Sequence, residues 1–230
     1  MARKPRLLLP GVPQHIVQRG NNRNPCFFAD NDYLRYLEVL QTAANENDVS
    51  IHAYVLMTNH VHLLATPRGE WGITNMMQDV GRKFVQFINR SYQRSGTLWE
   101  GRFRACLVES EAYLLTCMRY IELNPVRARM VEHPEAYRWS SYAANAGGTS
   151  DNLVQTHECY RALGLTNAAR AAAYRDLFRY QLEETRIKII RTALNGGLVL
   201  GKERFKDDVE RVLKRRVRPG KAGRPCKEGR

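Results

Sequence analysis

The spacing of apolar residues switches repeatedly between the two-residue period of a strand and the 3.6-residue period of a helix. Turn residues separate the segments, as at Gly20-Asn21-Asn22 and Thr58-Asn59. In order, the pattern predicts a strand, a helix, two strands forming a hairpin, a helix, a strand and a helix, at residues 15–20, 31–47, 50–57, 60–66, 73–92, 105–110 and 110–124.

This order of elements is that of a ferredoxin-like fold, βαββαβ, followed by one added helix at residues 110–124. We therefore expect an α+β protein with an antiparallel sheet and helices on one face. Residues with capping chemistry stand at two predicted helix starts: Asn31 or Asp32 for the first helix, and Ser110 for the added one.

Turn residues are concentrated at 145–152, and the pattern beyond them is helical, with a stop at Gly196-Gly197. We expect a principal domain at 1–145, a small helical module at 146–210 and a basic, flexible tail at 211–230.

Charge points to a polyanionic partner. The chain has 36 Lys and Arg against 23 Asp and Glu, a net charge of +13. Nine Lys or Arg and one Glu fall in residues 211–230, where KAGRPCK resembles the Gly-Arg-Pro core of segments that bind the DNA minor groove, with Ala222 where that motif prefers Arg. Arg224 is therefore a candidate DNA contact. A solvated tail without a partner is the alternative.

Other features narrow the class of protein. No apolar run reaches the roughly 18 residues of a membrane span, and the basic start is interrupted by Pro10 and Pro13, so we expect no export signal. The 5 cysteines are scattered, which predicts neither a disulfide framework nor a zinc knuckle. A cytoplasmic protein is expected.

The segment MTNHVHLLATP, residues 57–67, carries His60 and His62 within an apolar strand. Residues two apart on a strand point to one face about 6.6 Å apart, close enough for both imidazoles to reach one cation. A two-residue turn pairs Val55 with His62 and Met57 with His60. The remaining histidines are expected to be packing or surface residues: His15, His52, His133 and His157.

The helix containing CMRYIELNPVRARMV offers Tyr120 and Asn124, four residues apart. An amide oxygen is a ligand suited to Mg²⁺ or Mn²⁺, and a phenol one turn away would lie beside what the metal binds. Two alternatives stay open. Tyr113, Cys117 and Tyr120 recur at helical spacing, as core residues do, and Asn124 before Pro125 is typical of the N-cap of a following helix.

The segment AYVLMTNHVHLLATP, followed by LWEGRFRACLVESEAYLLTCMRYIELNPVRARMVEHPEAYRWSSY, resembles the HUH-type Y1 transposases of the IS200/IS605 kind. It is most similar to the branch of REP-associated tyrosine transposases, which the opening PGVPQHIVQRGNNR also suits. The resemblance covers about residues 9–144. Thr58 departs from the proline usual in M-P-N-H, and Asn124 stands where the insertion-sequence enzymes often have Gln.

The resemblance implies that His60, His62 and Asn124 bind Mg²⁺ or Mn²⁺ and that Tyr120 is the nucleophile. It implies a metal-dependent single-stranded DNA endonuclease and strand transferase that forms a 5′-phosphotyrosine and acts on hairpin (REP or palindromic) DNA. The expected partner is single-stranded or hairpin DNA, bound by a monomer or a homodimer.

Donors beside the predicted strand ends are candidate DNA contacts, with Trp99 and Phe103 available for base stacking. These contacts are Arg19, Asn21, Asn22, Arg23, Arg102 and Arg104. A solvated basic surface is the alternative for any one of them. Two other functions remain open: a DNA-binding repressor or architectural protein without catalysis, and a metal-dependent phosphodiesterase that uses water as the nucleophile.

Overall fold

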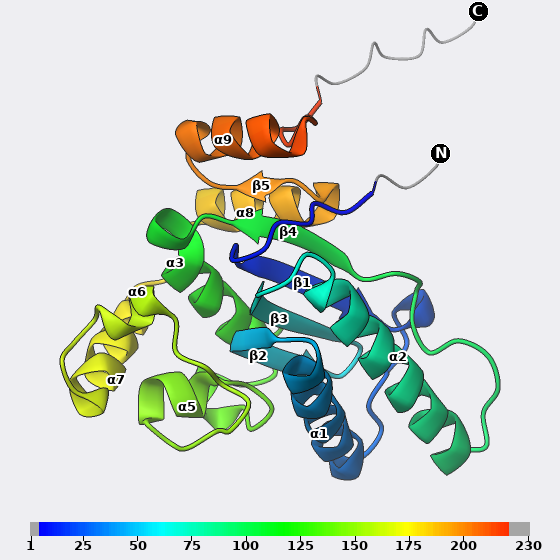
Figure 1. The fold of residues 1–230 in the computed structure, drawn as a ribbon. Helices are drawn as coiled ribbons and strands as arrows, with labels where there is room; N and C mark the ends of the chain where they lie inside the picture. The colour runs from blue at the N-terminus through cyan, green and yellow to red at the C-terminus, as the bar shows by residue number, and fades with distance from the viewer. Residues whose placement is uncertain (1–4, 221–230) are drawn as a thin grey trace, which may run out of the picture.

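The computed structural model describes residues 5–220 of the chain. In this part, strands form one sheet in the order β2-β3-β1-β4-β5 (Figure 1). The strands are β1 (Gln14–Arg19), β2 (Val49–Met57), β3 (His60–Pro67), β4 (Arg104–Val108) and β5 (Val199–Leu200). The first four pair antiparallel in the ferredoxin-like arrangement, so the predicted α+β fold is confirmed. The two-residue strand β5 was not predicted, and it joins β4 in parallel.

Helices cover both faces of the sheet, so the expectation of helices on one face is wrong. Helices α1 (Asp30–Glu46) and α2 (Gly72–Ser91) share one buried cluster with Ile16, Val61 and Leu63. Helix α3 (Ser110–Glu122) packs on the opposite face, in a cluster with Val17 and Leu64 (Figure 1). Each strand contributes side chains to both clusters, because residues i and i+2 lie on one face of the sheet and the residues between them lie on the other.

Neither predicted N-cap holds. Helix α1 begins after Ala29, and Asp32 is its third residue, where the carboxylate accepts the backbone N–H groups of Phe28 at 2.7 Å and of Ala29 at 3.0 Å. The residue before α3 is Glu109, and no side chain caps that helix.

The hairpin register is as predicted: Val55 pairs with His62 and Met57 with His60. Irregular pairing between Ile51 and Ala53 places His52 at a bulge. The His52 ring is hydrogen-bonded through Nδ1 to the carbonyl of Gln155 at 2.7 Å and through Nε2 to the hydroxyl of Thr66 at 2.8 Å. His52 is therefore a satisfied packing residue, as expected.

The C-terminal helices pack against α3 and extend around β4 (Figure 1). Tyr174, Ile190 and Leu194 belong to the same buried cluster as Leu114 of α3. Helix α8 (Glu184–Gly196) is followed by Gly197, whose φ of 60° is the left-handed conformation that glycine favours. The helices that follow α3 are α4 (Asn124–Arg127), α5 (Tyr142–Gly147), α6 (Glu158–Arg161), α7 (Asn167–Asp176), α8 (Glu184–Gly196) and α9 (Glu203–Leu213).

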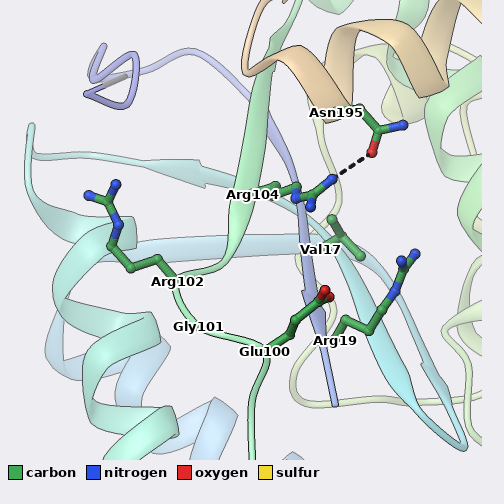
Figure 2. A pocket seen from close by; sticks show the side chains of 7 residues that line it. All are labelled: Val17, Arg19, Glu100, Gly101, Arg102, Arg104 and Asn195. Atoms are coloured by element: carbon green, nitrogen blue, oxygen red, sulfur yellow. Dashed lines mark hydrogen bonds between the residues drawn. The ribbon is translucent and has the colours of Figure 1, made fainter. Parts of the chain in front are cut away.

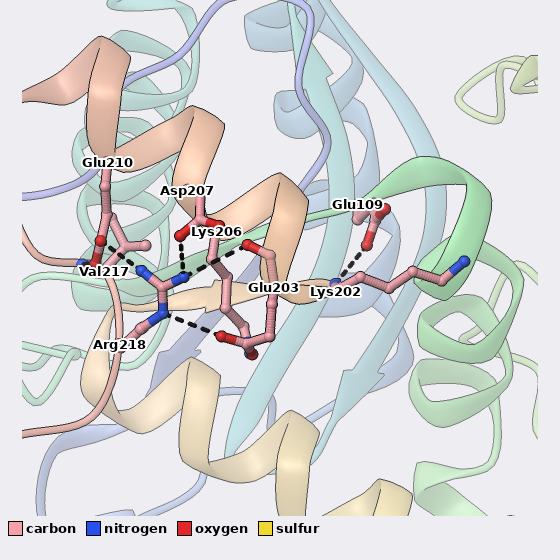
Figure 3. A network of polar contacts seen from close by, with 8 residues as sticks. All are labelled: Glu109, Lys202, Glu203, Lys206, Asp207, Glu210, Val217 and Arg218. Atoms are coloured by element: carbon pink, nitrogen blue, oxygen red, sulfur yellow. Dashed lines mark hydrogen bonds and ion pairs between the residues drawn. The ribbon is translucent and has the colours of Figure 1, made fainter.

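A group of ion pairs holds the end of the described chain against α9. Figure 3 shows Arg218 contacting Glu203, Asp207 and Glu210, which lie along one face of that helix. The carbonyl of Val217 accepts the backbone N–H of Val199 at 3.2 Å, so this segment lies beside β5. Arg224 lies outside the described residues. No helix among residues 5–220 is long and apolar enough to cross a membrane.

Candidate active site

His60 and His62 present their rings on the face of β3 that α3 covers, with ring centres 5.1 Å apart. Burial and then the charge of Arg19 lower the pKa of His60 to about 4. Burial, followed by the neighbouring rings of His15 and His60, also lowers the pKa of His62. Both imidazoles are therefore neutral at pH 7, which is the form that binds a metal ion.

The hydrogen bonds of the two rings identify the nitrogen atoms left for a cation. His60 Nδ1 donates to Asn59 Oδ1 at 2.7 Å, an orientation fixed because Asn59 Nδ2 donates to the carbonyl of Arg23. His62 Nδ1 lies 2.8 Å from His15 Nε2. Within residues 5–220 neither Nε2 makes a hydrogen bond, so one nitrogen of each ring can serve as a ligand.

Tyr120 lies beside this pair. Its ring centre is 6.0 Å from that of His62 and 5.6 Å from that of His15, edge-on to both. The side chain is only 4% exposed and belongs to the buried cluster of α3. Tyr120 is therefore both a core residue and a neighbour of the histidine rings, so the two interpretations of this residue are compatible.

Arg127 brings a positive charge to the same ring. The guanidinium carbon lies 4.2 Å from the centre of the Tyr120 ring, and Nη2 donates to the Tyr120 carbonyl at 2.6 Å. Burial lowers the pKa of Arg127 to about 10, so the group stays charged at neutral pH. Arg119 instead donates to the carbonyl of Tyr180.

Asn124 is the first residue of α4 and follows the tyrosine helix α3 by two residues. Its Nδ2 donates to the carbonyls of Tyr120 at 3.1 Å and Ile121 at 3.2 Å, while Leu123 is the N-cap residue of α4. The amide therefore caps the helix before it, and Oδ1 is the atom left for a cation. Residues 5–220 hold no group of three or more His, Cys, Asp or Glu placed to bind a metal. Imidazole nitrogens and amide oxygens are both ligand types that suit a divalent ion, and an amide is not among the four residue types named above.

A buried carboxylate fixes the tyrosine helix in place, and sequence reasoning missed it. Glu122 accepts hydrogen bonds from Ser141 Oγ at 2.6 Å, Asn145 Nδ2 at 2.8 Å and Tyr174 Oη at 2.8 Å. Burial raises its pKa to about 7 despite these donors. Because the donors come from the segment leading into α5, from α5 and from α7, Glu122 connects Tyr120's helix to the C-terminal helices.

His15 was expected to be a packing or surface residue, and its contacts with the candidate site were not predicted. It is fully buried on β1 and contacts both His62 and Tyr120. Burial, and then the charge of Arg127, lower the pKa of His15 to about 3. The ferredoxin-like order contained the signal, because it places the first strand beside the strand that carries the two histidines.

Three predicted DNA contacts lie together. Figure 2 shows Arg19, Arg102 and Arg104 around one pocket, which Glu100 and Asn195 also line. Arg104 Nη1 donates to Asn195 Oδ1 at 3.1 Å. The pocket forms where the end of β1, the chain leading into β4 and the end of α8 meet, so the C-terminal part contributes a polar side chain to this basic surface.

The other predicted contacts, Asn21, Asn22 and Arg23, form a short 3₁₀ turn beside the histidine hairpin. Asn22 and Arg23 have φ values of 52° and 60°, a left-handed conformation that costs free energy in non-glycine residues. The turn is held by Gly20, where an added Cβ would lie 2.2 Å from the Asn24 carbonyl oxygen. The backbone of this turn is bonded to the hairpin: Asn59 Nδ2 donates to the Arg23 carbonyl at 2.9 Å, and the Gly20 N–H donates to the Asn59 carbonyl at 2.8 Å.

The expectation that Trp99 and Phe103 stack on bases is wrong. Trp99 is 5% exposed and Phe103 is 8% exposed. Trp99 lies in the cluster beneath α1 and α2, and the guanidinium of Arg6 covers the Phe103 ring at 3.7 Å. Neither ring presents a face to a base.

Comparisons with known proteins identify a family and a similar fold. Residues 11–124 match the family model described as "Transposase IS200 like". The fold is similar to a REP-associated tyrosine transposase solved in complex with a REP hairpin, with a TM-score of 0.56, 16% identity, and coverage of 68% of this chain and 93% of that one. A protein from Deinococcus radiodurans R1 described as a transposase aligns with a TM-score of 0.37 and 17% identity, over 58% of this chain and 96% of that one.

No curated protein matches the chain. The family match spans the strand that carries His60 and His62 and ends at Asn124, so it contains Tyr120 as well. The chain belongs, through residues 11–124, to the family of IS200-like transposases.

Proposed function

We propose that this protein cleaves and rejoins single-stranded DNA beside a hairpin, with Tyr120 as the nucleophile and with His60, His62 and Asn124 as ligands of Mg²⁺ or Mn²⁺. The observation that carries the proposal is the 6.0 Å distance between the ring centres of Tyr120 and His62. A phenol and a pair of neutral imidazoles on one face can reach the same phosphodiester.

The reaction is a transesterification. The Tyr120 oxygen attacks phosphorus, a phenolic O–P bond forms, and the bond from phosphorus to the 3′ oxygen of the DNA breaks. The phenol loses its proton and the leaving 3′ oxygen gains one, giving a 5′-phosphotyrosine and a free 3′-OH. Because one phosphoester replaces another, a 3′-OH can attack the intermediate and rejoin the strand.

The side chains around Tyr120 have separate parts in this reaction. When bound, the divalent ion would offset the negative charge that develops on the phosphate. Arg127 keeps a positive charge against the Tyr120 ring, where it can offset the negative charge that develops during the reaction. Glu122 holds the helix that carries the nucleophile through its three hydrogen bonds.

Single-stranded DNA with a hairpin is the partner that the surface supports. Arg19, Arg102 and Arg104 form the basic pocket at the end of β1, and the turn at Asn21–Arg23 lies between that strand and the histidine hairpin. A strand that follows these donors would pass the two histidines. The structural relative was solved with a REP hairpin, which favours a hairpin substrate for this chain too.

The test is incubation of end-labelled, hairpin-bearing single strands with the protein and Mg²⁺ or Mn²⁺, followed by a denaturing gel. We expect a covalent adduct with the wild type and with Tyr113→Phe, a control on the same helix, and none with Tyr120→Phe. DNA binding without any adduct would favour the repressor alternative. Cleavage that survives in Tyr120→Phe would favour water as the nucleophile.

A further inference from the structure

His15 has an environment that packing alone does not explain. Its strand neighbours, Leu64 and Cys106, are buried and non-ionised, and the imidazole has no exposed surface. Nδ1 is a buried atom without a hydrogen-bond partner among the described residues. A polar ring that leaves one atom unpaired in a buried position costs free energy, so a compensating interaction is required.

That interaction is the contact with His62. His15 Nε2 lies 2.8 Å from His62 Nδ1, and the ring centres are 5.0 Å apart. A neutral imidazole carries one proton, so only one of these two nitrogens can be the donor. If His15 donates, the His62 proton is on Nε2, which then cannot bind a cation. If His62 donates, its Nε2 carries a lone pair directed away from His15.

We propose that His15 is a positioning residue for the metal site: it accepts the Nδ1 proton of His62 and thereby holds His62 in the tautomer whose Nε2 binds the divalent ion. The inference rests on the proposed function, because it assigns His62 the role of a ligand. Metal-binding histidines generally donate their second ring nitrogen to an acceptor that fixes ring and tautomer. Here a second imidazole is that acceptor, from the adjacent strand.

The same placement affects the nucleophile. The Tyr120 ring stands edge-on to His15 at 5.6 Å and to His62 at 6.0 Å, so both imidazoles form the wall against which the phenol packs. A shorter or apolar side chain at residue 15 would leave the His62 N–H unpaired and allow that ring to turn. His15 thus acts on the cation through His62 without touching it.

The experiment measures Mn²⁺ binding to the full chain, without DNA, by electron paramagnetic resonance of free Mn²⁺. His15→Leu removes the acceptor, and we expect affinity to fall by about 10- to 100-fold. His15→Gln places an amide oxygen near the position of Nε2, and we expect it to stay within a few-fold of wild type. His52→Leu is the matched control, because it removes another buried imidazole, and it should bind Mn²⁺ as wild type does.

A second readout reports the proton directly. In the Mg²⁺-saturated protein, long-range ¹H–¹⁵N spectra should place the His62 proton on Nδ1. A folded His15→Leu variant that binds Mn²⁺ as tightly as wild type would overturn the role of His15 and leave the proposed function intact. A His62 proton on Nε2 would overturn both the role of His15 and the role of His62 as a metal ligand. A wild-type protein that binds no Mn²⁺ but still forms the adduct would overturn the metal site, and the role of His15 with it.

Discussion

The guanidinium of Arg127 lies over the ring of Tyr120, 4.2 Å from its centre, and also donates a hydrogen bond to the Tyr120 carbonyl. Both contacts link the short helix α4 to the residue proposed as the nucleophile. A fixed positive charge beside an attacking phenol can offset the negative charge that develops in the transition state. Arg127 therefore both holds the backbone of Tyr120 and places a positive charge against its ring.

Replacing Arg127 by Met should slow adduct formation by about 100-fold, because a preorganised charge beside the reacting group is lost while the volume is nearly kept. Single-turnover rates of adduct formation give the measurement. Arg119→Met is the control, since that guanidinium bonds to the Tyr180 carbonyl instead. Equal rates for Arg127→Met and wild type would show that the charge has no catalytic part.

Replacing Glu122 by Ala should lower the free energy of unfolding by about 3 kcal/mol, because three buried hydrogen bonds are lost, the Tyr174 hydroxyl is left without an acceptor and a cavity forms. Urea unfolding measures the change. Glu38→Ala is the control: Glu38 pairs with Arg35 on the exposed surface of α1, and such pairs contribute less than about 1 kcal/mol. Similar effects at both positions would contradict the anchoring role of Glu122.

Replacing Arg104 by Ala should weaken binding of single-stranded DNA and reduce the slope of log affinity against log salt by about 1, as expected for one lost phosphate contact. Fluorescence anisotropy at several salt concentrations gives that slope. Arg35→Ala removes a positive charge on α1 that does not line this pocket, and it should leave the slope unchanged. If both variants change it equally, binding depends on net charge alone.

The acid stability of the protein should depend on His52. Burial lowers the pKa of His52 to about 4, with His157 the ionisable ring against it. The unfolded chain takes up this proton near pH 6.5, before the folded state does, so the stabilisation present above pH 6.5 is lost as pH falls toward 4. Between pH 7 and pH 5 the free energy of unfolding should fall less steeply in His52→Gln than in the wild type. The two slopes should differ by at most about 1.4 kcal/mol per pH unit. Identical slopes would contradict the lowered pKa.

Local patterns were sufficient for the features that depend on short stretches of chain. The two-residue turn at Thr58-Asn59 fixes the register that places His60 and His62 on one face, and the structure has that register. The amphipathic spacing of 73–92 likewise predicted α2, which spans Gly72–Ser91. The face on which each side chain lies follows from the two-residue period of a strand and the 3.6-residue period of a helix, and both periods can be read from the sequence.

Features that depend on contacts between distant segments were missed. The partner of His15 lies 47 residues away, and the partners of Glu122 lie 19 to 52 residues away. Strand β5 has only two residues, too few to show alternation. Trp99 and Phe103 read as accessible because they stand in a polar loop, but tertiary packing buries both. Such burial depends on which helices and strands pack together, and the local spacing of apolar residues does not reveal that.

The most direct test of the central claim identifies the tyrosine that becomes linked to DNA. The adduct formed with a hairpin-bearing strand and Mn²⁺ is digested with trypsin and nuclease, and the modified peptide is sequenced by mass spectrometry. Trypsin cuts after Arg119 and Arg127, so the account predicts the nucleotide on the peptide YIELNPVR, at Tyr120. A nucleotide on any other tyrosine would contradict it.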